Sequence, residues 1–507
     1  MIWECDYNQK RTKIVATFGP ALTGKLFTWQ QFKANKKEKD QAYKRVEQAF
    51  LSGLDVARLN FSHGNHEEQS IRIKIIRDVA KKLNKNIAIM LDTKGPEIRV
   101  GKVVDKRGND RKIEIAKDSI LTIKTKDFKP CTKDNEIYVY DSTKTYNMAK
   151  DLKVGKYILI DDGKLQLKVV SIDVVKGIIK AQALNTHTIY EKKRINLPNT
   201  KYTLPFLSQK DKEDIKFAID NDLDSIALSF VNNKENINEV KKYIAKYKPN
   251  KHIQLIAKIE TNEAINNIDD IIKNTDGIMV ARGDLALEVP FYNIPYFEKY
   301  ILDLCNKHKK YSIVATQMLD SLERNIQPTR AEVSDVFFAV ENGSDATMLS
   351  GESANGLFPL EAIKTMAAID IAAERTFDYQ KYFDKYFMPK KIPPKYKNLA
   401  KFLFAKALPK KAKGHFPSFP ISNIVMFSNE PKEIEAIWNA RVASKIYVAT
   451  SNKSILKYFA VSYGLNLLYC PNKITKTNIK QIVLKLKKDL KLKGKSYYLN
   501  NNNLYNI

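Results

Sequence analysis

Residues 255–260 read "LIAKIE", a short apolar run that ends in a lysine and a glutamate. A continuous apolar run of this length is typical of a strand in a parallel sheet whose two faces are both buried. Seven further segments have the same design: "KIVATFG" (13–19), "VARLNFS" (56–62), "IAIMLDT" (87–93), "SIALSFV" (225–231), "GIMVARGD" (277–284), "SIVATQM" (312–318) and "DATMLSGE" (345–352).

Segments with helical periodicity lie between these runs, for example "SIRIKIIRDVAKKL" (70–83) and "EAINNIDDIIKN" (263–274). Alternation of strands and helices predicts parallel strands that are joined by right-handed crossovers. Three of the eight runs come before residue 97 and five come after residue 199. Since eight is the number of strands that closes a (β/α)8 TIM barrel, the sequence predicts an α/β fold built on such a barrel.

The segment between the third and fourth runs has a different pattern. "KIEIAKDSILTIKTK" (112–126) and "KYILIDDGKLQLKVVSI" (156–172) alternate apolar and polar residues with period two. Asp162 and Gly163 form a hairpin signal inside the second of them. We therefore expect a small β-barrel domain inserted at residues 97–199.

The C-terminal part changes character again. Six of the 18 prolines fall within residues 389–420, which we interpret as a linker or irregular surface. Beyond it, "NIVMFS", "KIYVATS" and "LNLLYCP" alternate with helical patterns, as expected of a small open parallel sheet. The tail, "KLKGKSYYLNNNNLYNI" (491–507), shows little pattern, and we expect it to be partly disordered. The expected domains are the barrel in two parts, the inserted domain and a C-terminal α/β domain: 1–96, 97–199, 200–375 and 376–507.

Size and composition agree with a cytoplasmic protein of several domains. The chain has 507 residues, of which 44% are hydrophobic, and about 150 residues per domain would give about three domains. No apolar run approaches the roughly 20 residues that a membrane span needs. The N-terminus lacks an apolar signal core, and the four cysteines lie far apart with no CxxC, as expected of reduced thiols.

The net charge of +29 has two interpretations. It can indicate binding to nucleic acid or to another anionic surface. However, the lysines are scattered along the whole chain among Asp and Glu, and no compact basic arm is interleaved with aromatic residues. A general bias toward lysine is the simpler explanation, and the positive field would still favour anionic substrates.

Charged or hydroxyl side chains end seven consecutive runs. Because the carboxyl ends of barrel strands meet at one rim, where barrel active sites lie, we expect these side chains to gather there. A single polar strand end often marks only the start of a loop, but seven in succession indicate a site. They are Arg58, Asn60, Ser62, Asp92, Thr93, Ser229, Lys258, Glu260, Arg282, Asp284, Thr316, Gln317, Ser350 and Glu352.

The residue types fit phosphoryl transfer. Mg²⁺ takes one or two carboxylates and completes its shell with substrate oxygens and water, so Glu260 and Asp284 can both be ligands. Lys258 and Arg58 can neutralise a phosphoryl group. The N–H groups at the helix start near Gly283 can hold a carboxylate or phosphate. The alternative is a purely structural ion pair between Lys258 and Glu260, which would be costly in a dry interior.

At these residues the chain resembles the pyruvate kinase family from residue 12 to residue 365. The resemblance implies a barrel domain, an inserted domain that caps it and a C-terminal domain. The matching strings are "TKIVATFGPA", "DVARLNFSHG", "LDTKGPEIRVG", "INLPNT", "IAKIE", "IMVARGDLALEVP", "ATQMLDSL", "PTRAEVSDV" and "DATMLSGESANGLFPLEA".

The resemblance implies transfer of the phosphoryl group of phosphoenolpyruvate to ADP, with Mg²⁺ or Mn²⁺ and K⁺ as cofactors. Arg58 and Lys258 would hold the phosphoryl group, and Lys258 would also stabilise the enolate. Main-chain groups of Gly283 and Asp284, with Thr316, would hold the substrate carboxylate, and a proton relay would begin at Thr316. The remaining matches are Glu260 and Asp284 for Mg²⁺; Asn60, Ser62, Asp92 and Thr93 for K⁺; and His63, Arg99 and Lys193 for the nucleotide.

Glu97 matches family members that depend on K⁺, so we expect K⁺ dependence. The family also implies a homo-oligomer, namely a tetramer.

The chain departs from the family pattern in its first 200 residues and beside the metal positions. Residues 22–45 are longer and more basic than usual, and Arg194 replaces the usual glycine next to Lys193. Ala286 replaces a glycine in "RGDLA", and Glu298 stands where glutamine is common.

The C-terminal departure bears on regulation. "MFSNEPKE" stands in place of the family's phosphate-binding loop, where Glu430 would repel a phosphate and Pro431 lacks an N–H. We therefore expect no activation by fructose 1,6-bisphosphate. The Asn-rich tail also puts tetramer formation through this domain in question.

Three alternatives remain at this stage. "GPALTGKL" (19–26) nearly spells a P-loop, although Leu26 offers no hydroxyl to Mg²⁺ and Pro20 removes an N–H. A lyase or phosphomutase could use the same barrel for enolate chemistry, but it would not need residues 97–199. A nucleic-acid-binding protein could use the basic surface, and steep salt dependence of binding would reveal it.

Overall fold

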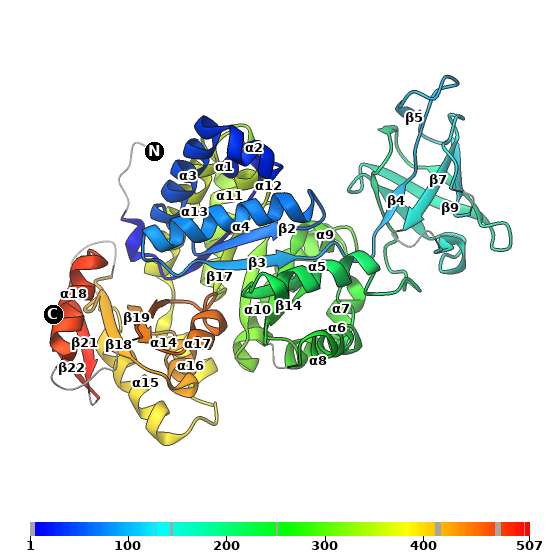
Figure 1. Ribbon diagram of the computed structural model, residues 1–507. Helices are drawn as coiled ribbons and strands as arrows, with labels where there is room; N and C mark the ends of the chain where they lie inside the picture. The colour runs from blue at the N-terminus through cyan, green and yellow to red at the C-terminus, as the bar shows by residue number, and fades with distance from the viewer. Residues whose placement is uncertain are drawn as a thin grey trace.

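The computed structural model describes residues 6–126, 128–141, 145–249, 252–410, 417–471, 478–500 and 502–507. Its centre is a closed barrel of eight parallel strands, and this confirms the predicted fold class (Figure 1). Around the barrel the strands follow the order β1-β17-β16-β15-β14-β13-β3-β2. Their bounds are β1 (Lys13–Thr17), β2 (Val56–Asn60), β3 (Ala88–Asp92), β13 (Ser225–Leu228), β14 (Gln254–Ile259), β15 (Gly277–Ala281), β16 (Tyr311–Ala315) and β17 (Ala346–Leu349).

Helices surround the barrel, and their apolar faces share one large core with the outward-facing strand residues. Side-chain caps fix several helix starts; Ser208 and Asp211 form a capping box at α5, as Thr329 and Glu332 do at α11. The helices of this layer are α1 (Pro20–Thr23), α2 (Trp29–Ala34), α3 (Lys36–Leu51), α4 (His66–Lys82), α5 (Gln209–Asp220), α6 (Lys234–Tyr247), α7 (Asn262–Asn266), α8 (Ile268–Asn274), α9 (Arg282–Leu285), α10 (Ile294–His308), α11 (Arg330–Glu341), α12 (Gly351–Ala354) and α13 (Pro359–Thr376).

A second, smaller barrel interrupts the first after β3 and projects from its rim (Figure 1). We call it the inserted barrel. Asp161, Asp162 and Gly163 all have positive φ in the tight turn between β8 and β9, as the hairpin signal predicts. Its seven strands are β4 (Ile98–Val100), β6 (Ile120–Lys124), β7 (Glu136–Asp141), β8 (Tyr157–Ile160), β9 (Leu165–Asp173), β10 (Ile178–Ala183) and β12 (Arg194–Asn196), and β5 (Ile113–Ile115) pairs with β11 (His187–Ile189) beside them.

The C-terminal domain contains a five-stranded sheet in the order β20-β19-β18-β21-β22. The expectation of a partly disordered tail is wrong for its last two strands, because β21 joins the sheet parallel to β18 and β22 pairs with β21. The strands are β18 (Asn423–Phe427), β19 (Lys445–Thr450), β20 (Leu465–Tyr469), β21 (Ser496–Asn500) and β22 (Asn503–Asn506); the helices are α14 (Tyr379–Tyr382), α15 (Pro394–Ala407), α16 (Pro431–Asn439), α17 (Lys453–Tyr458) and α18 (Ile479–Asp489).

Two expectations for this domain, the disordered tail and the irregular proline-rich stretch, are wrong in part for physical reasons. In the tail, Tyr497, Leu499 and Leu504 pack against the domain core, so a short period-two pattern lies hidden between the asparagines. In the proline-rich stretch, α15 is a regular helix, and its prolines lie at or outside its ends. Pro394 occupies the first turn, where the missing N–H costs no helical hydrogen bond.

The C-terminal domain packs against the amino ends of the barrel strands. Asp345, just before β17, accepts hydrogen bonds from Trp438 Nε1 (2.7 Å) and from the N–H of Tyr463 (3.1 Å). The buried guanidinium of Arg441 donates to the carbonyls of Gly343 and Ser344. This end of the barrel is therefore closed, and the opposite rim faces the inserted barrel.

Candidate active site

A cavity of about 570 Å³ lies between the carboxyl ends of the barrel strands and the inserted barrel. Thirteen residues were predicted for the site, and Thr93 and Thr316 alone among them do not line this cavity. Thr93 is buried behind it, and Thr316 contacts Gly283. The eleven that line it are Arg58, Asn60, Ser62, His63, Asp92, Arg99, Lys193, Lys258, Glu260, Gly283 and Asp284.

Lys258 lies at the centre of a polar network on the rim. Its Nζ donates to Asp92 Oδ1 (3.0 Å) and to Ser229 Oγ (2.8 Å). Arg58 binds the other oxygen of Asp92, with Nε at 2.7 Å from Oδ2. Two cations from β2 and β14 therefore share one buried carboxylate from β3.

This network favours the charged forms of Asp92 and Lys258. Burial acts to raise the pKa of Asp92, but Arg58 and Lys258 outweigh it and hold that pKa below its ordinary value. Burial acts to lower the pKa of Lys258, but Asp92 and Glu260 outweigh it and raise that pKa. Lys258 is therefore cationic throughout the physiological range, as an anionic substrate requires.

The ion pair between Lys258 and Glu260, one of the alternatives left by the sequence, is present with Nζ 2.9 Å from Oε1. It is one of several contacts of Lys258 and does not account for them all. The N–H of Phe230 donates to Glu260 Oε2 at 2.6 Å, from a residue with φ of 58°. Burial raises the pKa of Glu260 to about 7, and Lys258 offsets this only in part. A further cation at this carboxylate would favour its ionised form.

Glu260 and Asp284 follow neighbouring strands of the barrel and both line the cavity. No group of three or more His, Cys, Asp or Glu side chains that could hold a metal occurs among the described residues. A magnesium ion does not need such a group, because one or two carboxylates suffice when substrate oxygens and water complete the octahedron. This donor set therefore fits Mg²⁺ or Mn²⁺ better than a metal that requires a full protein cage.

Gly283 and Asp284 lie in the first turn of the short helix α9, as predicted. The N–H of Gly283 donates to Thr316 Oγ1 at 2.7 Å, so the two groups expected to hold a carboxylate contact each other here. Thr316 and Gln317 have φ of 70° and 54°, a left-handed conformation that is strained for residues with a side chain. This strain lies directly after β16, at the rim.

The four residues matched to K⁺ lie side by side at the ends of β2 and β3. Asn60 Oδ1 accepts from the N–H of Ser62 at 3.0 Å. Thr93 is tied to β13, because its carbonyl accepts from Ser229 Oγ at 2.7 Å. Neutral oxygens and the carboxylate of Asp92 therefore lie close together, a mixture suited to a monovalent ion.

The three residues matched to the nucleotide also line the cavity. His63 directly follows a residue matched to K⁺, whereas Arg99 and Lys193 come from the inserted barrel. Arg99 binds Glu97 through Nε (2.9 Å) and Nη2 (2.7 Å). Lys193 Nζ lies 2.6 Å from Asp161 Oδ1. Burial, and after it the charge of Arg99, lowers the pKa of His63, which favours a neutral imidazole.

Several rim residues do not belong to the cavity. Arg282 is buried and pairs instead with Glu298 (3.1 Å) and Asp335 (2.6 Å) beneath α9. Glu352 accepts from the N–H groups of Leu319 and Ser350, so it braces the loops after β16 and β17. The expectation that all these polar side chains gather at one site is therefore wrong for Arg282 and Glu352. Arg282 pairs with carboxylates away from the cavity, and Glu352 binds backbone N–H groups.

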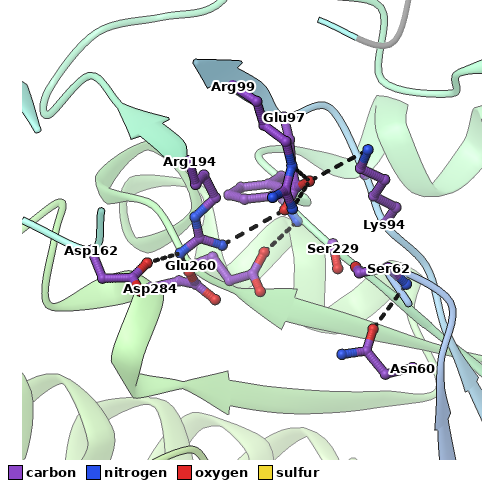
Figure 2. Close-up of polar contacts among 12 residues, drawn as sticks. Asn60, Ser62, Lys94, Glu97, Arg99, Asp162, Arg194, Ser229, Glu260 and Asp284 are labelled. Carbon is purple, nitrogen blue, oxygen red and sulfur yellow. Dashed lines mark hydrogen bonds and ion pairs between the residues drawn. The ribbon is translucent and has the colours of Figure 1, made fainter. Parts of the chain in front are cut away.

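Ser229 and Arg194 are among the cavity residues to which the sequence assigns no role. Ser229 was recognised only as a polar strand end, yet it contacts Lys258, Asp92 and Thr93. Arg194, which was noted only as a departure from the family, pairs with Asp284 (Figure 2). The position of Ser229 at the end of an apolar run is a sequence signal for this site. Nothing in the sequence around Arg194 indicates that its side chain reaches α9.

The comparisons with known proteins agree with this geometry. A sequence profile of the pyruvate kinase barrel domain matches residues 9–363. The pyruvate kinase of Mycoplasma pneumoniae is 49% identical over 463 residues, which cover 90% of this chain and 90% of that protein. The chain belongs to the pyruvate kinase family.

Other pyruvate kinases show the same relationship. That of Mycoplasma genitalium is 46% identical over 487 residues, which cover 94% of each chain. A crystal structure of a pyruvate kinase from Cryptosporidium parvum superimposes with a TM-score of 0.82 at 30% identity and covers 99% of this chain and 97% of that one. The pyruvate kinase fold thus includes the inserted barrel and the C-terminal domain. No described helix is long and apolar enough to cross a membrane.

Ser229 provides a test of how this pyruvate kinase positions its lysine. We expect Ser229→Ala to lower kcat about tenfold, because loss of one hydrogen bond to a charged group is worth about 1.5 kcal/mol. Steady-state pyruvate formation measures the effect. Ser225→Ala is the matched control, since Ser225 is buried at the opposite end of the same strand. Equal kcat for both variants would show that Ser229 does not position Lys258.

Proposed function

We propose that the enzyme transfers the phosphoryl group of phosphoenolpyruvate to ADP in glycolysis, with Mg²⁺ or Mn²⁺ and K⁺ as cofactors. The bond between the phosphorus and the enol oxygen breaks, and a terminal oxygen of ADP takes up the phosphoryl group. The enolate that is left takes a proton at carbon and becomes pyruvate. The observation that carries this proposal is the position of Lys258, a permanent cation held at the cavity by Asp92, Ser229 and Glu260.

The residues have distinct roles in this proposal. Arg58 and Lys258 hold the phosphoryl group, and Lys258 also faces the charge that develops on the enolate oxygen. Gly283, Asp284 and Thr316 hold the substrate carboxylate after the bond between Gly283 N and Thr316 Oγ1 exchanges partners, and Thr316 begins the proton relay. Mg²⁺, bound by Glu260 and Asp284, would neutralise charge on the substrate oxygens.

The monovalent ion and the nucleotide occupy the same cavity in this proposal. The inserted barrel supplies cations where a nucleotide would lie, which favours a kinase over a lyase or phosphomutase. The P-loop alternative gains no support, because residues 20–23 form the short helix α1. We propose Asn60, Ser62, Asp92 and Thr93 for K⁺, and His63, Arg99 and Lys193 for ADP.

The division of the chain and its cellular location are also proposals. We propose domains at 1–96, 97–199, 200–375 and 376–507, with the inserted barrel acting as the cap of the site. We propose a cytoplasmic location, where free thiols persist; Cys131, Cys305 and Cys470 are free, and Cys5 lies outside the described residues. We propose no nucleic-acid partner.

The first test compares wild type with Lys258→Met. We expect pyruvate formation from phosphoenolpyruvate and ADP to be stimulated by K⁺ about tenfold or more over a tetramethylammonium control, and to fall at least about a thousandfold in the variant. A lactate dehydrogenase-coupled assay measures both. Lys310→Met is the control, because Lys310 is half-buried at the closed end of the barrel. No turnover by folded wild type with Mg²⁺ and K⁺ would contradict the proposal.

We propose that fructose 1,6-bisphosphate does not activate this enzyme. Glu430 precedes α16 and Pro431 begins it, so the helix start has a negative charge and one N–H fewer. Ser428, the hydroxyl of this loop, already donates to Glu433. An anion would therefore meet two carboxylates and few free donors.

Substrate saturation curves test this directly. We expect fructose 1,6-bisphosphate at about 1 mM to leave the half-saturating concentration of phosphoenolpyruvate unchanged within about twofold, because like charges repel at this loop. The opposite result would be that the sugar phosphate lowers the half-saturating concentration of phosphoenolpyruvate in wild type, and by no more in Glu430→Thr. That result would mean that it activates from another site, and the proposal would be wrong.

We further propose that the enzyme is a homo-oligomer, with the tetramer implied by its family. Aromatic side chains emerge from the turn before α10 and from α10 itself; Phe291, Tyr292 and Tyr296 are 77%, 71% and 66% exposed. Tyr300 stacks on Tyr296 in the same row. Exposed aromatic clusters of this kind mark protein interfaces, and a second copy of the chain is the partner we propose.

Light scattering after size exclusion tests the oligomer. We expect a mass that is a multiple of 58.1 kDa for wild type and a smaller species for Tyr296→Lys, since a lysine there would be buried without a partner. Val175→Lys, at an exposed turn of the inserted barrel, is the control. A monomeric wild type at micromolar concentration would refute the proposal.

A further inference from the structure

Arg194 connects the inserted barrel to the candidate metal site. It begins β12, and its guanidinium forms an ion pair with Asp284 of α9 (Figure 2). Two more carboxylates lie within reach, with Asp162 Oδ1 at 3.6 Å and Glu97 Oε1 at 3.9 Å. The side chain of Arg194 is 20% exposed, so the guanidinium itself is largely shielded from water.

A divalent ion and this guanidinium share one carboxylate, that of Asp284. Asp284 is one of the two carboxylates proposed for the metal, and Arg194 Nη2 binds its Oδ1. The charge of Glu260, the other carboxylate, also acts on Arg194. A metal ion and the Arg194 guanidinium at the same carboxylate repel each other, so each weakens the binding of the other to Asp284.

Arg194 has two alternative carboxylate partners. Asp162 belongs to the hairpin of the inserted barrel and is 65% exposed, and Glu97 lies at the entry to the same barrel. The guanidinium can leave Asp284 and keep a carboxylate partner within its own part of the chain. The buried Nε of Arg194 has no hydrogen-bond partner among the described residues, so its present position leaves one donor unused.

We propose that Arg194 is a built-in cation of the metal site, which sets the affinity for divalent metal and ties the inserted barrel to the rim until a metal displaces it. The inference rests on the proposed binding of metal by Glu260 and Asp284. The apparent dissociation constant of the metal rises by the inverse of the fraction of molecules in which Asp284 is free. Removal of the guanidinium therefore tightens metal binding.

Binding of Mn²⁺, measured as the loss of the free-ion electron paramagnetic resonance signal, tests this without turnover. We expect Arg194→Ala to lower the dissociation constant for Mn²⁺ of the full chain about fivefold or more. This range follows because the substitution removes a charge-assisted bond to Asp284 for which the guanidinium has alternative partners. Arg194→Gln gives the same test with a side chain of similar length, should the alanine variant fail to fold.

Lys201→Ala is the matched control. Lys201 lies on the same return segment, and its ion pair with Glu263 of α7 (3.8 Å) also links this segment to the barrel. The substitution removes the same charge without freeing Asp284, so we expect the Mn²⁺ affinity of this variant to stay within about twofold of wild type. The titration is repeated at about 300 mM KCl. Salt screens the long-range field of the protein's net charge but screens the direct ion pair between Arg194 and Asp284 much less, so the two effects are separated.

Asp284→Asn separates failure of this inference from failure of the proposed function. If wild type binds Mn²⁺ in a way that needs Asp284, and Arg194→Ala binds it no tighter, the built-in cation is refuted and the metal site stands. If Asp284→Asn binds Mn²⁺ as well as wild type does, the metal site itself is wrong and the inference falls with it. An equal gain in Lys201→Ala would attribute the effect to net charge and would also refute the inference.

Discussion

Closure of eight parallel strands is the constraint on which the rest of the molecule depends. β1 pairs with β17 on one side and with β2 on the other, so the sheet has no edge. All eight carboxyl ends then meet at one rim, and this brings together residues as distant in the chain as Arg58 and Ser350. Apolar positions along each strand are buried, and the polar side chains at the carboxyl ends are the ones that can reach a ligand.

The two other parts of the chain use the two ends of this barrel differently. The C-terminal domain satisfies buried groups at the amino ends, where Asp345 and Arg441 bind backbone and indole donors or acceptors. The inserted barrel instead contributes charged side chains at the carboxyl ends and leaves a cavity there. One end is therefore built for stability and the other for electrostatics, because burial without partners is costly whereas a hydrated cavity can hold charges.

Charge balance within the cavity depends on pairs that cross between strands. Asp92 is shared by Arg58 and Lys258, Glu260 by Lys258 and the N–H of Phe230, and Asp284 is bound by Arg194. Each carboxylate thus has a cation or a donor before any ligand arrives. An incoming metal or anionic substrate has to exchange with these partners, so the affinity of the site reflects a competition rather than an empty space.

The sequence by itself determined the eight apolar runs, their alternation with helices, the period-two pattern of the inserted barrel and most of the cavity residues, because these depend on local periodicity and on where each strand ends. It did not determine that β21 and β22 extend the last sheet, since the apolar positions of the tail are few and become a pattern only against the core. It also did not separate Lys258 from Arg282. Both lie at the carboxyl end of a strand, but Lys258 faces the cavity and Arg282 pairs with Glu298 and Asp335 beneath α9. The pairing of Arg194 with Asp284 joins residues 90 positions apart. Tertiary structure alone decided it, because side-chain direction and long-range distance are set by packing and leave no trace in local sequence.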